Sequence, residues 1–279
     1  MSVIDCHHHF QYRARRPAQY PPAVGNRLDR DYTEEDLRPL LVECGIDQTI
    51  VVQLVNDMRE TEELLDLQTR LDTLAGVVGW VPLAEPAACA AALERLSGQG
   101  NLVGIRHLIA YEPDPKWLLQ PAVLESLALL AEANLVFEGI PVNDAQFESL
   151  LAMARRLPEL KVVLNHMGNP PVPDNGWEPW ASGIARAAEL PNMSVKLSAG
   201  LALVVRWKWS TEALRKYADH VIDLFTPDRV MAGSNWPVIL LGASFTEAWR
   251  GIENLIAGLS ATEQQAILGG TAARVYRIA

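Results

Sequence analysis

Short apolar runs recur along the chain at intervals that suit strands separated by helices. Most of these runs are nearly continuous in Val, Ile and Leu, which is typical of parallel strands buried on both faces. We therefore predict eight strands. They cover residues 3–6, 49–53, 76–83, 102–108, 135–140, 161–166, 193–199 and 229–237.

The segments between these runs carry apolar residues at helical spacing, as the leucines of residues 60–74 illustrate. Asp144 is predicted to be the N-cap of one helix. Ser260 is predicted to be the N-cap of another, because Glu263 follows three residues later, as in a capping box. The predicted helices cover residues 60–74, 87–96, 121–133, 144–157, 177–190, 211–225, 246–259 and 260–274.

This alternation of strands and helices predicts an α/β fold, a (β/α)₈ barrel formed by residues 1–279 as one domain. The alternative, a doubly wound open sheet, would have a glycine-rich turn after the first strand, where this chain has three histidines. Irregular segments follow three predicted strand ends, where barrel enzymes build their sites. They are residues 11–32, 169–177 and 199–209, and we expect them to determine the substrate.

Composition narrows the classes of partner. The 24 basic and 34 acidic residues give a formal net charge of −10, which argues against a nucleic-acid surface. No apolar run approaches the roughly 20 residues that span a membrane. The three cysteines are too few and too scattered for a disulfide framework. We therefore expect a reduced, cytoplasmic protein with a small-molecule substrate.

The first candidate for chemistry is the histidine run that ends the first predicted strand. Alternation along a strand puts His7 and His9 on one face and His8 on the other. Two imidazoles that face the barrel axis suit a metal ion or a polar substrate group. The alternative without a function is a solvated loop or a tag remnant. A tag is disfavoured because the histidines continue an apolar strand and are followed by Phe10.

Further polar residues lie on other predicted strands. Arg106 suits a carboxylate or lactone oxygen, or a structural ion pair, and adjacent His107 points the opposite way. Glu138 inside a buried strand needs a partner and is a candidate metal ligand, general base or ion-pair partner of Lys196. His166 ends the sixth predicted strand. These strands converge on one mouth in a barrel, which favours a shared site.

Asn235 follows the eighth predicted strand and can bond substrate or backbone, but it cannot act as a general base. Trp80 and Trp236 are candidate substrate contacts. The tryptophans of the loops form either an aromatic wall for a ring-shaped substrate or caps on the barrel core, and for any single one the cap is favoured. These loop residues are Trp177, Trp180, Trp207, Trp209 and Trp236.

Seven segments, in order along the predicted barrel, resemble the amidohydrolase-related family of the amidohydrolase superfamily, and within it the sugar-lactone and pyrone-dicarboxylate lactonases. IDCHHHF resembles the family opening I-D-x-H-x-H-F, and LNHMGNP resembles D-H-x-G-K-P. VKLSAG resembles C-K-L-S-G, and GSNWPV resembles G-S-D-W-P-V. The other segments are VVGWVPL, GIRHLIAYEPDPKWL and ILGGTAARVYRI.

The resemblance implies a distorted barrel that hydrolyses a lactone or a related bond. It matches His7, His9 and His166 to the family's histidines. It also implies that Arg106 binds a substrate carboxylate or polarises the substrate carbonyl. Some relatives hold one zinc and several lactonases work without metal. The three histidines would therefore either hold Zn²⁺ or bond the substrate directly. Lys196 and His107 are further substrate-binding candidates, and the resemblance permits a monomer or small homo-oligomer.

One departure concerns the general base, because Asn235 occupies the position of the family's strand-8 aspartate. Losing a positioned base typically costs about 10²–10⁴ in rate. Proton transfer would then fall to His166 or Glu138, with Asn235 positioning water or substrate. An engineered residue in an ordinary lactonase, altered natural chemistry and an inactive binding protein all fit this change. Asn165, Asn169 and Pro82 are further departures.

We predict a lactone hydrolase from these features. A non-hydrolytic relative, such as an isomerase or decarboxylase, or a ligand-binding protein is the alternative. The loss of the family lysine at position 169 predicts a substrate less anionic than a sugar acid.

Overall fold

The computed structural model describes residues 2–15, 20, 24 and 27–278. Eight parallel strands follow one another in chain order around one sheet, which confirms the predicted (β/α)₈ barrel. The strands are β1 Ile4–His8, β2 Gln48–Val52, β3 Leu74–Gly79, β4 Leu102–Arg106, β5 Val136–Gly139, β6 Val162–Leu164, β7 Met193–Leu197 and β8 Val230–Ala232.

The barrel closes where the chain passes beyond the end of β8. His8 forms a parallel bridge with Trp236. The backbone N–H of His9 donates to the carbonyl of Trp236, and the N–H of Asn235 donates to the carbonyl of His7, both at 2.7 Å. These backbone hydrogen bonds therefore hold His7 and His9 next to Asn235.

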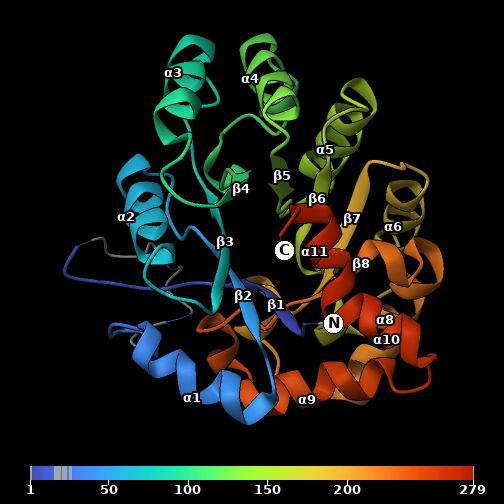
Figure 1. Cartoon of the computed structure of the whole chain (residues 1–279). Helices are drawn as coiled ribbons and strands as arrows, with labels where there is room; N and C mark the ends of the chain where they lie inside the picture. The colour runs from blue at the N-terminus through green and yellow to red at the C-terminus, as the bar shows by residue number, and fades with distance from the viewer. Residues whose placement is uncertain (1, 16–19, 21–23, 25–26, 279) are drawn as a thin grey trace.

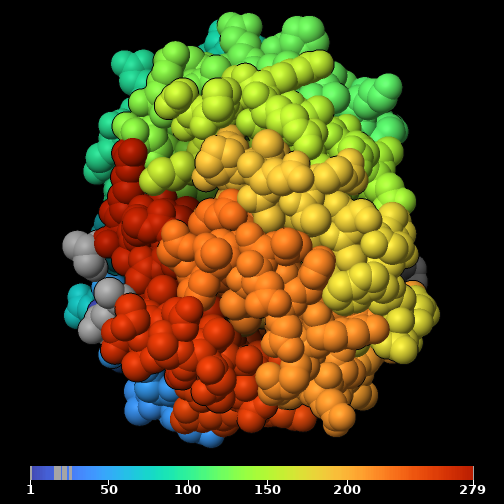
Figure 2. All heavy atoms as spheres, turned by 90° about the vertical axis from the view of Figure 1, so that its right-hand side faces the viewer, coloured from blue at the N-terminus to red at the C-terminus, as the bar shows by residue number. Residues whose placement is uncertain are grey.

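Helices surround the strands, as Figure 1 shows, and the second half of the chain covers the face seen in Figure 2. No helix in the described ranges has the length and apolar character needed to cross a membrane. The helices are α1 Glu34–Cys44, α2 Met58–Gln68, α3 Pro86–Leu96, α4 Pro121–Glu132, α5 Asp144–Arg156, α6 Trp180–Ala188, α7 Leu201–Val204, α8 Thr211–Phe225, α9 Phe245–Ile256, α10 Ala261–Gln265 and α11 Thr271–Tyr276.

Two local predictions need correction. Helix α1 was not predicted, because Pro39 lies inside it and interrupts the expected helical composition. Asn143, rather than Asp144, is the N-cap of α5, since its side chain accepts a hydrogen bond from the Gln146 N–H. The capping box of Ser260 with Glu263 is confirmed.

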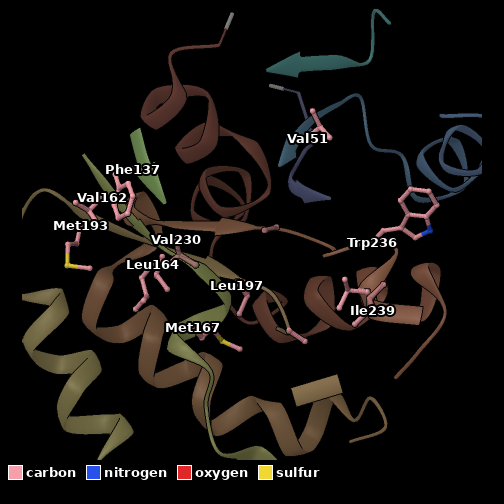
Figure 3. Close-up of a cluster of buried hydrophobic side chains, with 14 of the residues drawn as sticks. Val51, Phe137, Val162, Leu164, Met167, Met193, Leu197, Val230, Trp236 and Ile239 are labelled. Atoms are coloured by element: carbon pink, nitrogen blue, oxygen red, sulfur yellow. The ribbon is translucent and has the colours of Figure 1, made fainter. Parts of the chain in front are cut away.

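Apolar side chains pack on both faces of the strands. Phe137, Val162 and Leu164 belong to the outer core between strands and helices (Figure 3). Their neighbours Val136 and Val163 alternate with them and face a second cluster inside the barrel. The C-terminal helix α11 contributes to this inner cluster, whose members include Ile50, Val52, Val78, Met231, Val275 and Tyr276. Helix α11 therefore packs its buried side chains against the barrel interior instead of joining the outer ring.

Parts of the predicted substrate loop over residues 11–32 lie outside the described residues, namely 16–19, 21–23 and 25–26. The other two predicted irregular segments contain short helical turns, Val172–Asp174 in one and α7 in the other.

Candidate functional site

Three consecutive histidines at the end of β1 divide between two sides of the strand, as alternation predicts. The Nε2 atoms of His7 and His9 lie 3.3 Å apart. His8 turns to the other side, where its Nε2 lies 3.0 Å from Thr49 Oγ1. All three rings are buried, so His7 and His9 form a water-shielded pair.

His166 joins this pair from the turn after β6. Its ring centroid lies 4.6 Å from that of His7, and its Nδ1 lies 2.7 Å from Ser198 Oγ. The backbone of His166 has a φ of 54°, and Asn235 has a φ of 56°. Side-chain-bearing residues adopt this left-handed region at a cost, and such strain often marks functional positions.

A buried ion pair lies beside the histidines. Lys196 on β7 donates to Glu138 Oε1 on β5 at 2.6 Å, and its Nζ lies 3.1 Å from His7 Nδ1. Asn165 Nδ2 donates to Glu138 Oε2 at 3.1 Å, and the Tyr276 hydroxyl donates to Glu138 Oε1 at 2.5 Å. The predicted Glu138–Lys196 pair is therefore present in the structure, and both carboxylate oxygens are occupied.

Burial is the main cause of a lowered pKa at all three imidazoles. The pKa values of His7, His9 and His166 lie well below the usual range. The cation of Lys196 lowers the pKa of His7 further, and that of Arg106 does the same for His9 and His166. These imidazoles are neutral near pH 7, so each can accept or donate a proton according to its tautomer.

Arg106 ends β4 and pairs in register with Glu138 on β5. Its Nη2 donates to the carbonyl of Gln53 and lies 3.3 Å from Gln53 Oε1. Its Nε–H is buried and has no hydrogen-bond partner within the described part of the chain. Burial lowers the pKa of Arg106 to about 10, so the group remains a cation near pH 7. The site thus contains an unused charged donor.

Asn235 has one engaged and one unengaged end. Its Nδ2 donates to the carbonyl of Ala199 at 2.7 Å. Its buried Oδ1 has no partner among residues 2–15, 20, 24 and 27–278.

Asp5, which was assigned no role from the sequence, accepts hydrogen bonds from the Ser234 N–H at 2.8 Å and from the Ser234 hydroxyl at 2.6 Å. These bonds connect β1 to the segment that follows β8. Burial raises the pKa of Asp5 to about 6.

His107 and Trp80 were predicted to bind substrate, and the structure places them in a packed group. Trp80 Nε1 donates to His107 Nδ1 at 3.0 Å, and His107 Nε2 lies 2.7 Å from Glu112 Oε1. The His107 ring stacks on Trp117 with centroids 4.1 Å apart. Protein atoms therefore engage both ring nitrogens of His107.

Trp236 is buried and packs edge-on against Phe10 and Tyr32. In the predicted aromatic wall, Trp177 lies against Trp180, whose Nε1 donates to the carbonyl of Met167 at 2.7 Å. Trp180 thereby supports the turn that carries His166. Trp207 and Trp209 form a separate pair with centroids 5.8 Å apart.

The histidine pair matches part of a zinc site. Two nitrogens bound to one tetrahedral zinc at about 2.0–2.1 Å are about 3.4 Å apart, close to the observed His7–His9 spacing. However, no group of three or more His, Cys, Asp or Glu is arranged to hold a metal in the described ranges. Lys196 also occupies His7 Nδ1 as a donor. The spacing of His7 and His9 therefore suits zinc, but the described residues do not form a complete site.

A cavity of about 360 Å³ lies between α5 and α6. Pro141, Phe147, Asn169 and Trp180 belong to its walls. None of the three site histidines lines it. Within this wall, the side chain of Asn169 donates to the Pro141 carbonyl at 3.0 Å, and Gly168 and Asn169 follow His166 closely along the chain. The cavity is therefore a neighbour of the candidate site.

Comparison with known proteins places this arrangement in context. A family model for amidohydrolases matches residues 4–278. The chain is 32% identical over 279 residues to a protein named L-fucono-1,5-lactonase from Burkholderia ambifaria, covering 99% of this chain and 95% of that one. A solved amidohydrolase from Burkholderia multivorans with bound zinc is 32% identical, with a TM-score of 0.90 over 100% of both chains. A solved structure from Pseudomonas putida, whose name assigns it as a 2-pyrone-4,6-dicarboxylic acid hydrolase, shares the fold. It is 24% identical, with a TM-score of 0.74 over 99% of this chain and 97% of that one.

Proposed function

Because this chain belongs to the amidohydrolase family, we propose that it hydrolyses a small sugar lactone at the His7–His9–His166 site. The proteins named lactonases that it resembles support this reaction. The observation that carries it is the buried Arg106 Nε–H, which has no hydrogen-bond partner within the described ranges and belongs to a cation whose charge lowers the pKa of His9 and His166. Such a donor suits a carbonyl oxygen that gains negative charge during hydrolysis.

A substrate without multiple negative charges fits the surrounding side chains. The site offers amides at Asn165 and Asn235, each with a buried Oδ1 that lacks a partner within the described ranges. Amide oxygens accept hydrogen bonds from hydroxyl groups. At position 169, where the resembled family has a lysine, this chain has the uncharged amide of Asn169. A polyhydroxylated, neutral lactone matches this set of acceptors.

His166 is the residue we assign as general base. Asn235 has no basic group, and Glu138 already accepts from Lys196, Asn165 and Tyr276. His166 uses Nδ1 toward Ser198, which leaves Nε2 for water. A neutral imidazole is the form that can accept a proton.

The reaction then balances in two steps. Water attacks the lactone carbonyl carbon while its proton passes to His166 Nε2, and the carbonyl oxygen becomes an oxyanion next to the Arg106 Nε–H. As the carbonyl re-forms, the ring C–O bond breaks, and the alkoxide takes the proton from the His166 imidazolium. The product is the open-chain hydroxy acid.

Metal content needs its own measurement, because a solved relative has bound zinc. A zinc ion at the two histidines would polarise the lactone carbonyl. We propose that the side chains described above suffice. Elemental analysis of the purified chain, with assays after chelation and after zinc addition, tests this proposal. Loss of activity on chelation and its return with zinc would contradict it.

The experiment for the function measures acid release from L-fucono-1,5-lactone and other aldonolactones, using a pH indicator and a no-enzyme control for spontaneous opening. Saturable hydrolysis supports the proposal. Binding without turnover would instead indicate a ligand-binding protein, and products of isomerisation or decarboxylation would indicate the other alternative. Gel filtration tests the predicted monomer or small homo-oligomer, while cell fractionation tests the predicted cytoplasmic location.

A further inference from the structure

The last residue of the C-terminal helix reaches the centre of the barrel. Tyr276 ends α11, and its buried hydroxyl donates to Glu138 Oε1 at 2.5 Å. Burial, reinforced by the charge of Glu138, raises the pKa of this phenol well above its usual range. The hydroxyl therefore keeps its proton and stays a donor. No role in the reaction proposed above uses Tyr276.

The hydrogen bonds continue from this tyrosine to the histidine pair. Glu138 Oε1 accepts from both Tyr276 and Lys196, and Lys196 Nζ is 3.1 Å from His7 Nδ1. An ammonium has donors and no acceptor, so His7 Nδ1 must be the acceptor in this contact. A neutral imidazole with a lone pair on Nδ1 carries its proton on Nε2.

His9 completes the chain in the same direction. Its Nδ1 lies 2.7 Å from the carbonyl oxygen of Val52, which can only accept, so the His9 proton is on Nδ1. His9 Nε2 is then a lone pair and accepts from His7 Nε2–H at 3.3 Å. Each donor from Tyr276 to His9 therefore faces an acceptor when the His7 proton is on Nε2 and the His9 proton is on Nδ1.

We propose that Tyr276 is a positioning residue, which acts through Glu138 and Lys196 to keep the His7 proton on Nε2. It holds one oxygen of Glu138, which holds the ammonium of Lys196 against His7 Nδ1. His7 then presents an N–H, rather than a lone pair, on the His9 side of the ring. This inference rests on the proposed function for its kinetic consequence: when a lactone binds, its carbonyl oxygen replaces His9 Nε2 as the acceptor of the His7 Nε2–H.

A purely structural Tyr276 would have a different consequence. The hydroxyl would then satisfy the carboxylate and stabilise the fold, but its removal would leave the His7 proton where it is. The position of that proton separates the two roles, and it can be measured without substrate. A nitrogen that bears hydrogen and one that bears a lone pair give well separated ¹⁵N chemical shifts in a neutral imidazole.

The experiment compares Y276F with Y217F in full-length, ¹⁵N-histidine-labelled protein. Tyr217 is the matched control, because its buried hydroxyl donates to the Gly176 carbonyl at 2.7 Å, away from the histidines. H7N identifies the His7 signals by their absence. K196M is the positive control, because it removes the donor to His7 Nδ1 directly.

We expect the His7 signals of the parent protein and Y217F to show hydrogen on Nε2. In K196M and Y276F they should move toward the tautomer with hydrogen on Nδ1. With a hydrolysed lactone, kcat should fall about 10-fold in Y276F, the size of one charge-assisted hydrogen bond, while KM and the Y217F rates stay near the parent values.

Unchanged His7 shifts in folded Y276F, alongside shifted signals in K196M, would overturn the role of Tyr276. Hydrogen on Nδ1 of His7 in the parent protein would overturn the whole proton arrangement. Absence of lactone hydrolysis with the expected shifts would count against the proposed function alone, because the spectra require no substrate.

Discussion

Lys196 Nζ lies 2.6 Å from Glu138 Oε1, and both side chains are completely buried inside the barrel. Two charges leave water at such a position, so each depends on the other and on the donors and acceptors around them. Tyr276 and Asn165 supply donors to the carboxylate, and His7 supplies the acceptor that faces the ammonium. The site and the fold therefore share one network.

Breaking this pair should cost stability. K196M leaves the Glu138 carboxylate without its cation, and we expect the free energy of unfolding to fall by about 3–5 kcal/mol. The double variant E138Q/K196M should lose less than the sum of the two single variants, because it leaves no unpaired charge. Urea unfolding of the four proteins measures this coupling. Strict additivity of the two single effects would contradict it.

Arg106 should promote lactone hydrolysis through the position of its N–H donors as well as through its charge. R106K keeps a cation but lacks the Nε–H that stands without a partner in the described structure. We expect kcat/KM for the lactone to fall about 10²–10³-fold, as for the loss of an oxyanion donor. R59K is the control, since Arg59 pairs with Asp57 on the exposed surface. Equal activity of R106K and R59K would contradict the assignment.

Restoring an aspartate at position 235 should not create an efficient base. Asn235 Nδ2 donates to the Ala199 carbonyl at 2.7 Å, and a carboxylate there would face that oxygen without a donor. We expect N235D to be less stable by about 1–3 kcal/mol and to gain little in kcat. Kinetic assays and thermal unfolding check both effects. A 100-fold increase in kcat would identify the position as a disabled catalytic base.

The buried imidazoles should make stability depend on pH. Folding lowers the pKa values of His7, His9 and His166, so the unfolded chain binds protons first as pH falls below 6.5. Their stabilisation is present above pH 6.5 and is lost below it, by up to about 1.4 kcal/mol per pH unit for each group. The raised pKa of Asp5, about 6, works in the opposite direction between pH 6 and 3.8.

The measurement is urea unfolding between pH 7.5 and 5.5, with H8Q as the comparison. Burial lowers the pKa of His8 to about 3, so this residue adds to the same loss, although it faces away from the site toward Thr49. H8Q should therefore lose less stability than the parent over this range. Equal pH dependence in the two proteins, or rising stability toward pH 5.5, would contradict this account.

Much of the fold follows from hydrophobic patterning. All eight strands overlap the predicted runs, because buried parallel strands produce continuous apolar segments, although β3 and β8 end before the predicted residues 83 and 237. Helix α1 escaped prediction because Pro39 weakens the helical pattern, although Thr33 and Asp36 form a capping box before it and Gly45 ends it. Those caps were the available signal.

The site was predictable only in part. His7, His9 and His166 could be grouped because strand ends of a barrel meet at one mouth, and the structure does bring them together. The contribution of Tyr276 could not be read from the sequence, because α11 packs its buried side chains against the barrel interior instead of continuing the outer ring. The one feature of the sequence that pointed to Tyr276 was the segment ILGGTAARVYRI, which contains it and resembles the family pattern.

The position of a polar residue on a predicted helix or strand also does not show which groups its side chain hydrogen-bonds. His107 looked available for substrate, yet Trp80 and Glu112 occupy its two nitrogens through contacts that span loops. Long-range hydrogen bonds of this kind depend on tertiary packing, which local sequence patterns do not encode.

The most direct test of the central claim is the rate of L-fucono-1,5-lactone opening by the purified chain and by H166Q, measured side by side above the spontaneous rate. We predict saturable hydrolysis by the parent protein and a fall of about 10²–10⁴-fold in kcat for folded H166Q, the usual contribution of a positioned general base. Equal rates for the two proteins would contradict the assignment of His166, and no hydrolysis of this or any other aldonolactone by the parent protein would contradict the proposed function itself.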